Sequence, residues 1–341
     1  MAAAAAIPLP KWVMLERFIF RRDDPASFRG DARTTAASTT SVGASFRISF
    51  VLADPPTPSR LYLSWPDGPK RDKMCHLVAA HRDLVLLRLD SFLDTSSPNP
   101  SPFGEIAHDY FLYIADPRSR AQLLTPVLRR LPACTVHNAH YGRPISPVAE
   151  LVKKIEGGRD EDHFCHHCLS QDYISCHPSG RAELYRSVCV TESGRTLAFL
   201  DVVHHDGADM GRMTPAESGF AIVSMALTGT RAAEAVMAEA DELWAAHSLE
   251  DLPREVMMIP LMSMDEPDAA HFVLYDWGHA VGKVSLVTID MSTKRVVVSV
   301  VPYINGEDDL ATDDADFVKA KPNFFMHFLP AEFPKFLNVN L

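Results

Sequence analysis

Hydrophobic residues in this chain recur with a period of two over short runs. In the run 46–52, Phe46, Ile48, Phe50 and Leu52 alternate with polar or smaller residues. Because successive side chains of a strand point to opposite faces, this alternation predicts a strand with one face on a core. Further runs rich in β-forming residues predict strands at 12–20, 61–65, 84–89, 110–114, 196–203, 220–227, 271–275, 283–289 and 295–302.

Many of the breaks between these runs are proline-rich, and the chain has 25 prolines against 16 glycines. The segments 54–58 and 95–102 are too rich in proline to hold a ladder of hydrogen bonds, so we expect surface turns there. Many short strands separated by turns predict a mainly β fold, a sandwich or a propeller, rather than alternating strands and helices.

Two segments predict short helices. In 146–156, Ser146 can cap the first turn, Pro147 suits the first helical position, and the glycines at 157 and 158 end the pattern. The alanine-rich segment 231–246 has high helix propensity and predicts the second helix.

Size and charge limit the classes of protein to which this chain can belong. The 341 residues, 47% of them hydrophobic, suffice for one large β-rich domain, and the formal net charge of −11 without a basic stripe argues against nucleic acid as a partner. The N-terminal alanine run lacks the basic start of a secretory signal, and no apolar stretch is long enough to span a membrane. We therefore expect a soluble protein of the cytosol or nucleus, whose six scattered cysteines stay reduced.

Several segments together resemble a known family. They are 12–15, 52–56, 81–88, 109–113, 260–274, 283–291 and 328–337. In this order they resemble the plant domain of unknown function 1618, a family expanded in grasses. The resemblance implies a fold similar to the propeller-like domains that follow F-boxes, and it implies no catalytic residue or cofactor. In relatives, the counterpart of 235–244 is similar to a strand followed by Asp-Glu-Leu-Trp-Ala, which conflicts with the helix propensity of this segment and leaves both alternatives open.

The predicted fold is thus a mainly β, propeller-like set of short antiparallel sheets with one or two short helices, either complete or with a missing or degraded blade. Within a single domain spanning 1–341, we expect N-terminal sheets over 1–136, a Cys/His-rich insert with a short helix over 137–180, and C-terminal sheets over 181–341 that carry the family-like region.

The insert holds the sharpest local chemistry of the sequence. Cys165, Cys168, Cys176 and either His177 or His163 could supply four zinc ligands, and Cys-x-x-Cys is a common half of such a site. The second pair is adjacent rather than spaced like the first, which favours incidental thiols and imidazoles over a zinc site. A redox or catalytic role for Cys165 or Cys168 lacks the surrounding strand–helix pattern.

Other polar clusters have plainer interpretations. The acidic run around 307–316 lacks the alternating ligands and central glycine of a calcium loop, so we expect a solvated loop. Phosphate-binding glycine loops, a nucleophile elbow and a His-Glu-x-x-His motif are absent from the sequence. These observations favour a non-enzymatic protein-interaction module, and the alternative is a metal- or thiol-dependent enzyme that uses the Cys/His cluster at 163–177.

Overall fold

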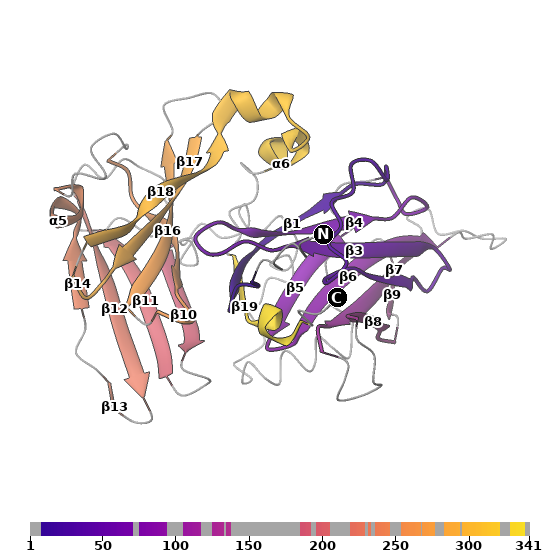
Figure 1. The fold of residues 1–341 in the computed structure, drawn as a ribbon, viewed down its shortest axis with the longest axis horizontal. Coiled ribbons are helices and arrows are strands. Elements are labelled where there is room, and N and C mark those ends of the chain that lie inside the picture. Colours follow the sequence, from indigo (N-terminus) through magenta and orange to yellow (C-terminus); the bar gives the residue numbers. More distant parts are fainter. Residues whose placement is uncertain are drawn as a thin grey trace, which may run out of the picture.

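The computed structural model describes residues 8–70, 75–93, 105–116, 125–132, 134–137, 185–191, 196–204, 219–228, 231–232, 236–245, 254–266, 268–276, 283–293, 295–320 and 328–337. These residues form a mainly β protein built from four small sheets, named A to D below (Figure 1). All ten strands predicted from the alternating runs are present, so the predicted fold class is confirmed.

Sheet A joins the two ends of the chain. Its strands are β1 (Val13–Arg21), β2 (Ala36–Thr39), β3 (Ser45–Val51), β4 (Ser59–Ser64) and β19 (Leu329–Ala331), in the order β19-β1-β4-β3-β2. β1 pairs in parallel with β4 and antiparallel with β19. The last described strand of the chain therefore completes the sheet that the first strand begins.

The other three sheets are antiparallel and are formed in chain order. Sheet B contains β5 (Cys75–His81), β6 (Leu84–Leu93), β7 (Glu105–Ile114), β8 (Val127–Arg130) and β9 (Cys134–His137). Sheet C contains β10 (Arg186–Thr191), β11 (Thr196–His204), β12 (Phe220–Thr228), β13 (Arg231–Ala232) and β14 (Val236–Glu239). Sheet D contains β15 (Met258–Met262), β16 (Ala269–Asp276), β17 (Lys283–Asp290) and β18 (Arg295–Asn305). Short helices follow three strands: α5 (Ala240–Trp244), η5 (Gly306–Ala311) with α6 (Ala315–Ala320), and η7 (Phe333–Phe336).

The prediction of a helix over 231–246 is largely wrong. This segment forms β13, β14 and only then the five-residue α5. β14 pairs antiparallel with β12, and this places Ala238 opposite Ile222 with both side chains fully buried in one core. The strand pairing and burial outweigh the helix propensity of alanine, which is below 1 kcal/mol per residue. The pattern that the resemblance implied, a strand followed by Asp-Glu-Leu-Trp, is the one observed.

β1 contributes to two separate hydrophobic cores. Val13 and Leu15 belong to the core between sheets A and B, whereas Met14, and Trp12 just before the strand, belong to the core that sheet A shares with sheets C and D. This division follows from the alternation of side chains along a strand. In sheet D, β16 is buried from Ala269 to Tyr275, which means that both of its faces are covered. The sheets therefore stack in the order C, D, A, B (Figure 1).

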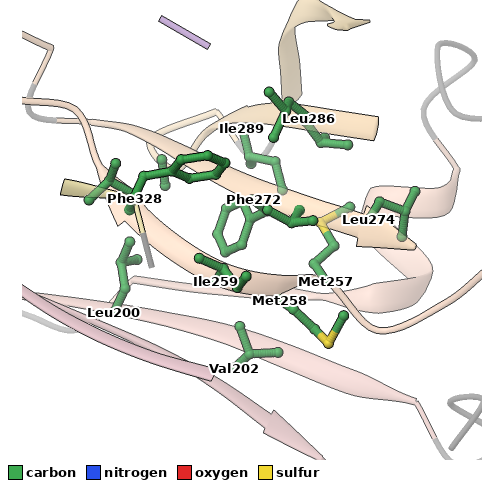
Figure 2. Packing of buried hydrophobic residues seen from close by; sticks show 14 of the residues in the cluster. Leu200, Val202, Met257, Met258, Ile259, Phe272, Leu274, Leu286, Ile289 and Phe328 are labelled. Carbon is green, nitrogen blue, oxygen red and sulfur yellow. The ribbon is translucent and has the colours of Figure 1, made fainter. Parts of the chain in front are cut away.

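The core between sheets C and D is aliphatic and sulfur-rich. Figure 2 shows Leu200 and Val202 of β11 directed toward Met258 and Ile259, with Phe272 beyond them. All five side chains are at most 2% exposed. Burial on this scale contributes about 1.5–3 kcal/mol for each large apolar side chain.

An aromatic and charged clasp ties sheet D to sheet A. Phe317 of α6 is 1% exposed, and its ring centroid lies 5.3 Å from those of Phe18 and Phe20. Beside it, Arg22 contacts Asp316 at 2.9 Å, and Arg60 forms an ion pair with Asp314.

The clasp qualifies the expectation of a solvated acidic loop. Glu307 and Asp308 are exposed, as expected. Asp314 and Asp316 instead contact arginines that are distant in the sequence.

Replacing Phe317 with alanine is expected to lower the free energy of unfolding by about 3–5 kcal/mol, because it removes a fully buried aromatic side chain from the joint between two sheets. Val42→Ala is the matched control, since Val42 is 45% exposed and its truncation should cost less than about 0.5 kcal/mol. Urea denaturation followed by far-ultraviolet circular dichroism measures both, and equal stabilities of the two variants would contradict the assignment.

Candidate functional site

The predicted zinc ligands cannot be placed in the fold. Cys165, Cys168, Cys176 and His177, with the alternative ligand His163, all lie outside the described residues, as does the helix predicted over 146–156. Across the ranges that are described, no group of three or more histidine, cysteine, aspartate or glutamate side chains is arranged to hold a metal ion. The zinc site stays a prediction from the sequence.

The side chains of two other cysteines are described, and neither suits a thiol nucleophile. Burial raises the pKa of Cys75 to about 12 and that of Cys189 to about 11. A thiol with so high a pKa is almost wholly protonated at neutral pH, and the thiolate is the reactive form. Both are free thiols, in agreement with the expectation of reduced cysteines for the described part of the chain.

A buried polar cluster spans three strands of sheet B. Asp90 of β6 lies 2.6 Å from Nδ1 of His108, 3.0 Å from Nε of Arg88, and 3.5 Å from Nε2 of His76. Burial by itself would raise the pKa of Asp90, but the hydrogen bonds from His108 and His76 and the positive charge of Arg88 hold that pKa well below its usual range. Asp90 is therefore an ionised carboxylate inside the protein.

This cluster resembles an acid–base pair but is enclosed. Asp90 is 0% exposed and His108 is 7% exposed, so neither presents a reactive atom to a bound substrate. A general base must come within hydrogen-bonding distance of the proton that it removes. We interpret the cluster as an internal ion network that links β5, β6 and β7. Its sequence signal is the alternate charged residues, Arg88 and Asp90, in an otherwise apolar strand.

A second polar group lies at the joint between sheets A and D. Trp12 donates its indole N–H to Asp265 at 2.6 Å, and its ring centroid lies 5.6 Å from that of His271. His271 is 5% exposed and its Nδ1 lies 2.9 Å from the hydroxyl of Thr288. Burial lowers the pKa of His271 to about 4, against a smaller opposite effect of the Asp265 carboxylate. The joint therefore contains a neutral histidine at physiological pH.

The most unusual surface of the molecule is the outer face of sheet C, the face turned away from sheet D. Of the eleven exposed large hydrophobic side chains found among the described residues, eight belong to sheet C. Seven of them lie on the outer face: Val188, Val190, Leu197, Val203, Met225, Leu227 and Met237. The eighth, Val236, pairs with Ser224 and lies on the opposite face of this strand. Exposed apolar patches of this kind are uncommon on soluble monomers and mark interaction sites.

Strand register gathers most of these side chains into continuous rows. Val190 pairs with Leu197, which in turn pairs with Leu227 on the next strand. A second row runs from Val188 across Phe199 to Met225. Cross-strand neighbours in an antiparallel sheet lie about 4.5–5.5 Å apart, so the rows form one contiguous apolar surface.

One ion pair interrupts this surface. The next row pairs Arg186 with Asp201 and then Val223 with Met237. Nε of Arg186 donates to both carboxylate oxygens of Asp201 at 3.1 Å. The pair is local and neutral overall, which leaves the surrounding surface apolar.

Sequence reasoning missed this surface although a signal was present. The strands at 196–203 and 220–227 are nearly continuous in hydrophobic residues, rather than alternating as in 46–52. Continuous runs are typical of strands that are covered on both faces. The structure covers the inner face with sheet D and leaves the outer face exposed.

The fold defines a mainly β, propeller-like protein with one exposed apolar sheet face. The model of the family described as Protein of unknown function (DUF1618) matches residues 165–271 of this chain. This match confirms the resemblance seen in the sequence. The matched segment contains all of sheet C, and of the resembling segments it overlaps only 260–274.

Comparison with solved structures adds one weak likeness. A mutant α-L-arabinofuranosidase from Fusarium graminearum, in complex with an iminosugar inhibitor, is 12% identical to this chain at a TM-score of 0.21. The likeness covers 86% of this chain and 71% of the other. At this TM-score it supports no conclusion about fold or activity. No curated protein matches the chain. In the described part of the chain, every helix is too short or too polar to cross a membrane.

The free energy of unfolding is expected to fall by about 2 kcal/mol between pH 7 and pH 5 because of His271. The pKa of His271 is about 4 in the folded protein, against about 6.5 for an unfolded chain. Between these values the unfolded chain binds a proton that the folded protein does not, so the stabilisation is complete above pH 6.5 and is lost as the pH falls toward 4.

Denaturation of His271→Phe at both pH values tests this, since the variant should show a smaller loss than the wild type. Exposed His81, replaced with phenylalanine, is the matched control. If His271→Phe and His81→Phe show the same pH dependence, the burial assigned to His271 is wrong.

Proposed function

We propose that this protein is a non-enzymatic interaction module that binds another protein through the outer face of sheet C. The observation that carries the proposal is the concentration of exposed apolar side chains on that face. Removing apolar surface from water contributes roughly 25 cal/mol of favourable free energy per Å². Sheets A and D are covered on both faces, and a protein docked on sheet C would cover the corresponding surface there.

The composition of the face suits a protein partner. Met225 and Met237 are flexible and polarisable, so they can adapt to a facing surface. The neutral Arg186–Asp201 pair can exchange hydrogen bonds with polar groups of a partner. A second copy of the chain is a poorer occupant, because each copy carries a net charge of −11 and like charges repel.

The proposal includes a location in the cytosol or nucleus and no nucleic-acid partner. It is supported by the free thiols of Cys75 and Cys189 and by the acidic net charge of the chain.

A photo-activatable crosslinking residue at Leu227 is expected to give one adduct of discrete mass in cells of the source organism. The adduct should fall more than about tenfold when Val188→Asp and Met225→Glu are added, because two charges then lie in the apolar interface. The matched control is Val42→Asp with Val51→Glu, which adds the same two charges away from sheet C. Val51 lies in sheet A and Val42 in the turn before β3, and their side chains are 37% and 45% exposed.

The proposed surface would be wrong if the control pair reduced the adduct as much as the sheet C pair. It would also be wrong if the same crosslinking residue placed at Val51 captured the same protein.

The alternative function is a metal- or thiol-dependent enzyme centred on the Cys/His cluster at 163–177. Its test is elemental analysis of the purified protein, for which we expect well below one zinc per chain, because the spacing of Cys176 and His177 does not match a structural zinc site. A stoichiometric zinc that is lost in Cys165→Ser with Cys168→Ser, without change in circular dichroism, would favour the enzyme.

A further inference from the structure

The side chain of Arg186 lies across the outer face of sheet C. It starts from β10, and its Nε donates to both carboxylate oxygens of Asp201 on β11 at 3.1 Å. Asp201 lies between Phe199 and Val203 on the same face of its strand, and Val223 pairs with it on β12. The side chain of Asp201 is 12% exposed, whereas that of Arg186 is 48% exposed. An enclosed carboxylate therefore holds a half-exposed guanidinium in place among apolar side chains.

Most of the hydrogen-bonding capacity of Arg186 is unused within the described part of the chain. A guanidinium has five N–H donors. The Nε–H group donates to Asp201, while Nη1 and Nη2 donate to no group of the described residues. Water can reach these donors in the free protein, because about half of the side chain is exposed. A partner that covers the face removes this water, and each buried donor left without an acceptor weakens binding.

We infer that the partner places an amide carbonyl against Nη1 and Nη2 of Arg186, within an otherwise apolar patch. The carbonyl belongs to a glutamine or asparagine side chain or to the partner's main chain. This inference rests on the proposed function. The apolar rows supply most of the affinity, and Arg186 selects among apolar partners, because a partner without an acceptor at this position leaves the guanidinium unsatisfied.

The charge of the site favours a neutral acceptor. Arg186 and Asp201 already form a neutral pair. A carboxylate of the partner would accept the same hydrogen bonds, but it would bury a second negative charge beside Asp201 in a chain with a net charge of −11. A lysine would meet the guanidinium with a charge of the same sign. An amide carbonyl accepts hydrogen bonds without adding charge.

The same requirement separates the partner from a second copy of this chain. The strands β10, β11, β12, β13 and β14 contain neither asparagine nor glutamine. The strands of a second copy's sheet C therefore offer no side-chain amide to Arg186. This observation adds to the repulsion between two acidic chains as a reason to favour a different protein.

Designed amphipathic helical peptides of about five turns serve as probes, since they span the apolar rows from Leu197 to Val203, about 20 Å along the strand. Each peptide has leucines along one face, and a central position of that face is glutamine, leucine, glutamate or lysine. Fluorescence anisotropy with the full-length protein is expected to show the glutamine peptide binding at least about fivefold more tightly than each of the other three.

Two matched double variants test whether Arg186 causes this preference. Arg186→Met with Asp201→Leu replaces the ion pair by apolar side chains, so the leucine peptide should then bind at least as tightly as the glutamine peptide. Lys335→Met with Glu332→Leu is the control, because it removes an ion pair at η7, away from sheet C. The preference for glutamine should stay unchanged in the control, and circular dichroism checks that both variants keep the fold.

The outcomes distinguish this inference from the proposed function. Equal binding of the glutamine and leucine peptides, with both lost in Val188→Asp with Met225→Glu, would overturn the role of Arg186 and leave the interaction surface standing. Tightest binding of the glutamate peptide would overturn the neutral acceptor, and so would a preference for glutamine that persists in Arg186→Met with Asp201→Leu. Failure of all four peptides to bind would overturn the inference as well, while crosslinking at Leu227 would still test the surface by itself.

Other occupants of the face are detected by peroxide oxidation of methionine. Met225 and Met237 are 40% and 49% exposed, whereas Met14 and Met257 are at most 1% exposed and provide internal controls. We expect the first two to oxidise at least about tenfold faster. Protection of Met225 and Met237 in the isolated protein would show that another part of this chain covers the face. Protection that grows with protein concentration, with a dimer in sedimentation, would show a second copy. Either result would overturn both proposals.

Discussion

Burial of β1 on both of its faces is the constraint on which the rest of the structure depends. Val13 and Leu15 pack toward sheet B, and Trp12 and Met14 pack toward sheets C and D. Because one strand contributes to both cores, the halves of the molecule cannot separate without exposing apolar surface. The pairing of β19 with β1 adds a second tie, since it brings the end of the chain to the same sheet.

The polar contacts at the joint between sheets A and D supplement this packing and give it orientation. The indole N–H of Trp12 is bound to Asp265, and the clasp of Phe317 with Arg22 and Arg60 lies on the same side of sheet A as the core shared with sheets C and D. Directional contacts of this kind select one arrangement of the sheets, whereas apolar burial alone is compatible with several. The buried network around Asp90 acts similarly within sheet B, where it links three neighbouring strands.

The stack of sheets also explains why the apolar surface lies on sheet C. Sheets D and A each have a neighbouring sheet on both sides. In sheet B, one face packs on sheet A, and Asp90 and His108 on the other face are also buried. Sheet C has sheet D on one side and exposed valine, leucine and methionine on the other. Its strands nevertheless carry the continuous hydrophobic composition of a covered sheet. This mismatch between composition and exposure is what supports a binding role.

The sequence by itself determined ten of the described strands and the class of fold. Alternation at 46–52 and the β-rich runs elsewhere placed all ten predicted strands correctly, because the period of side chains is a local property of the chain. The segment 231–246 was misjudged, since only pairing with β12 makes a strand of its alanines. The enclosure of Asp90, the neutral state of His271 and the exposed face of sheet C were decided by the tertiary structure. Each depends on which residues from distant parts of the chain come to lie beside it, and a local pattern carries no record of those neighbours.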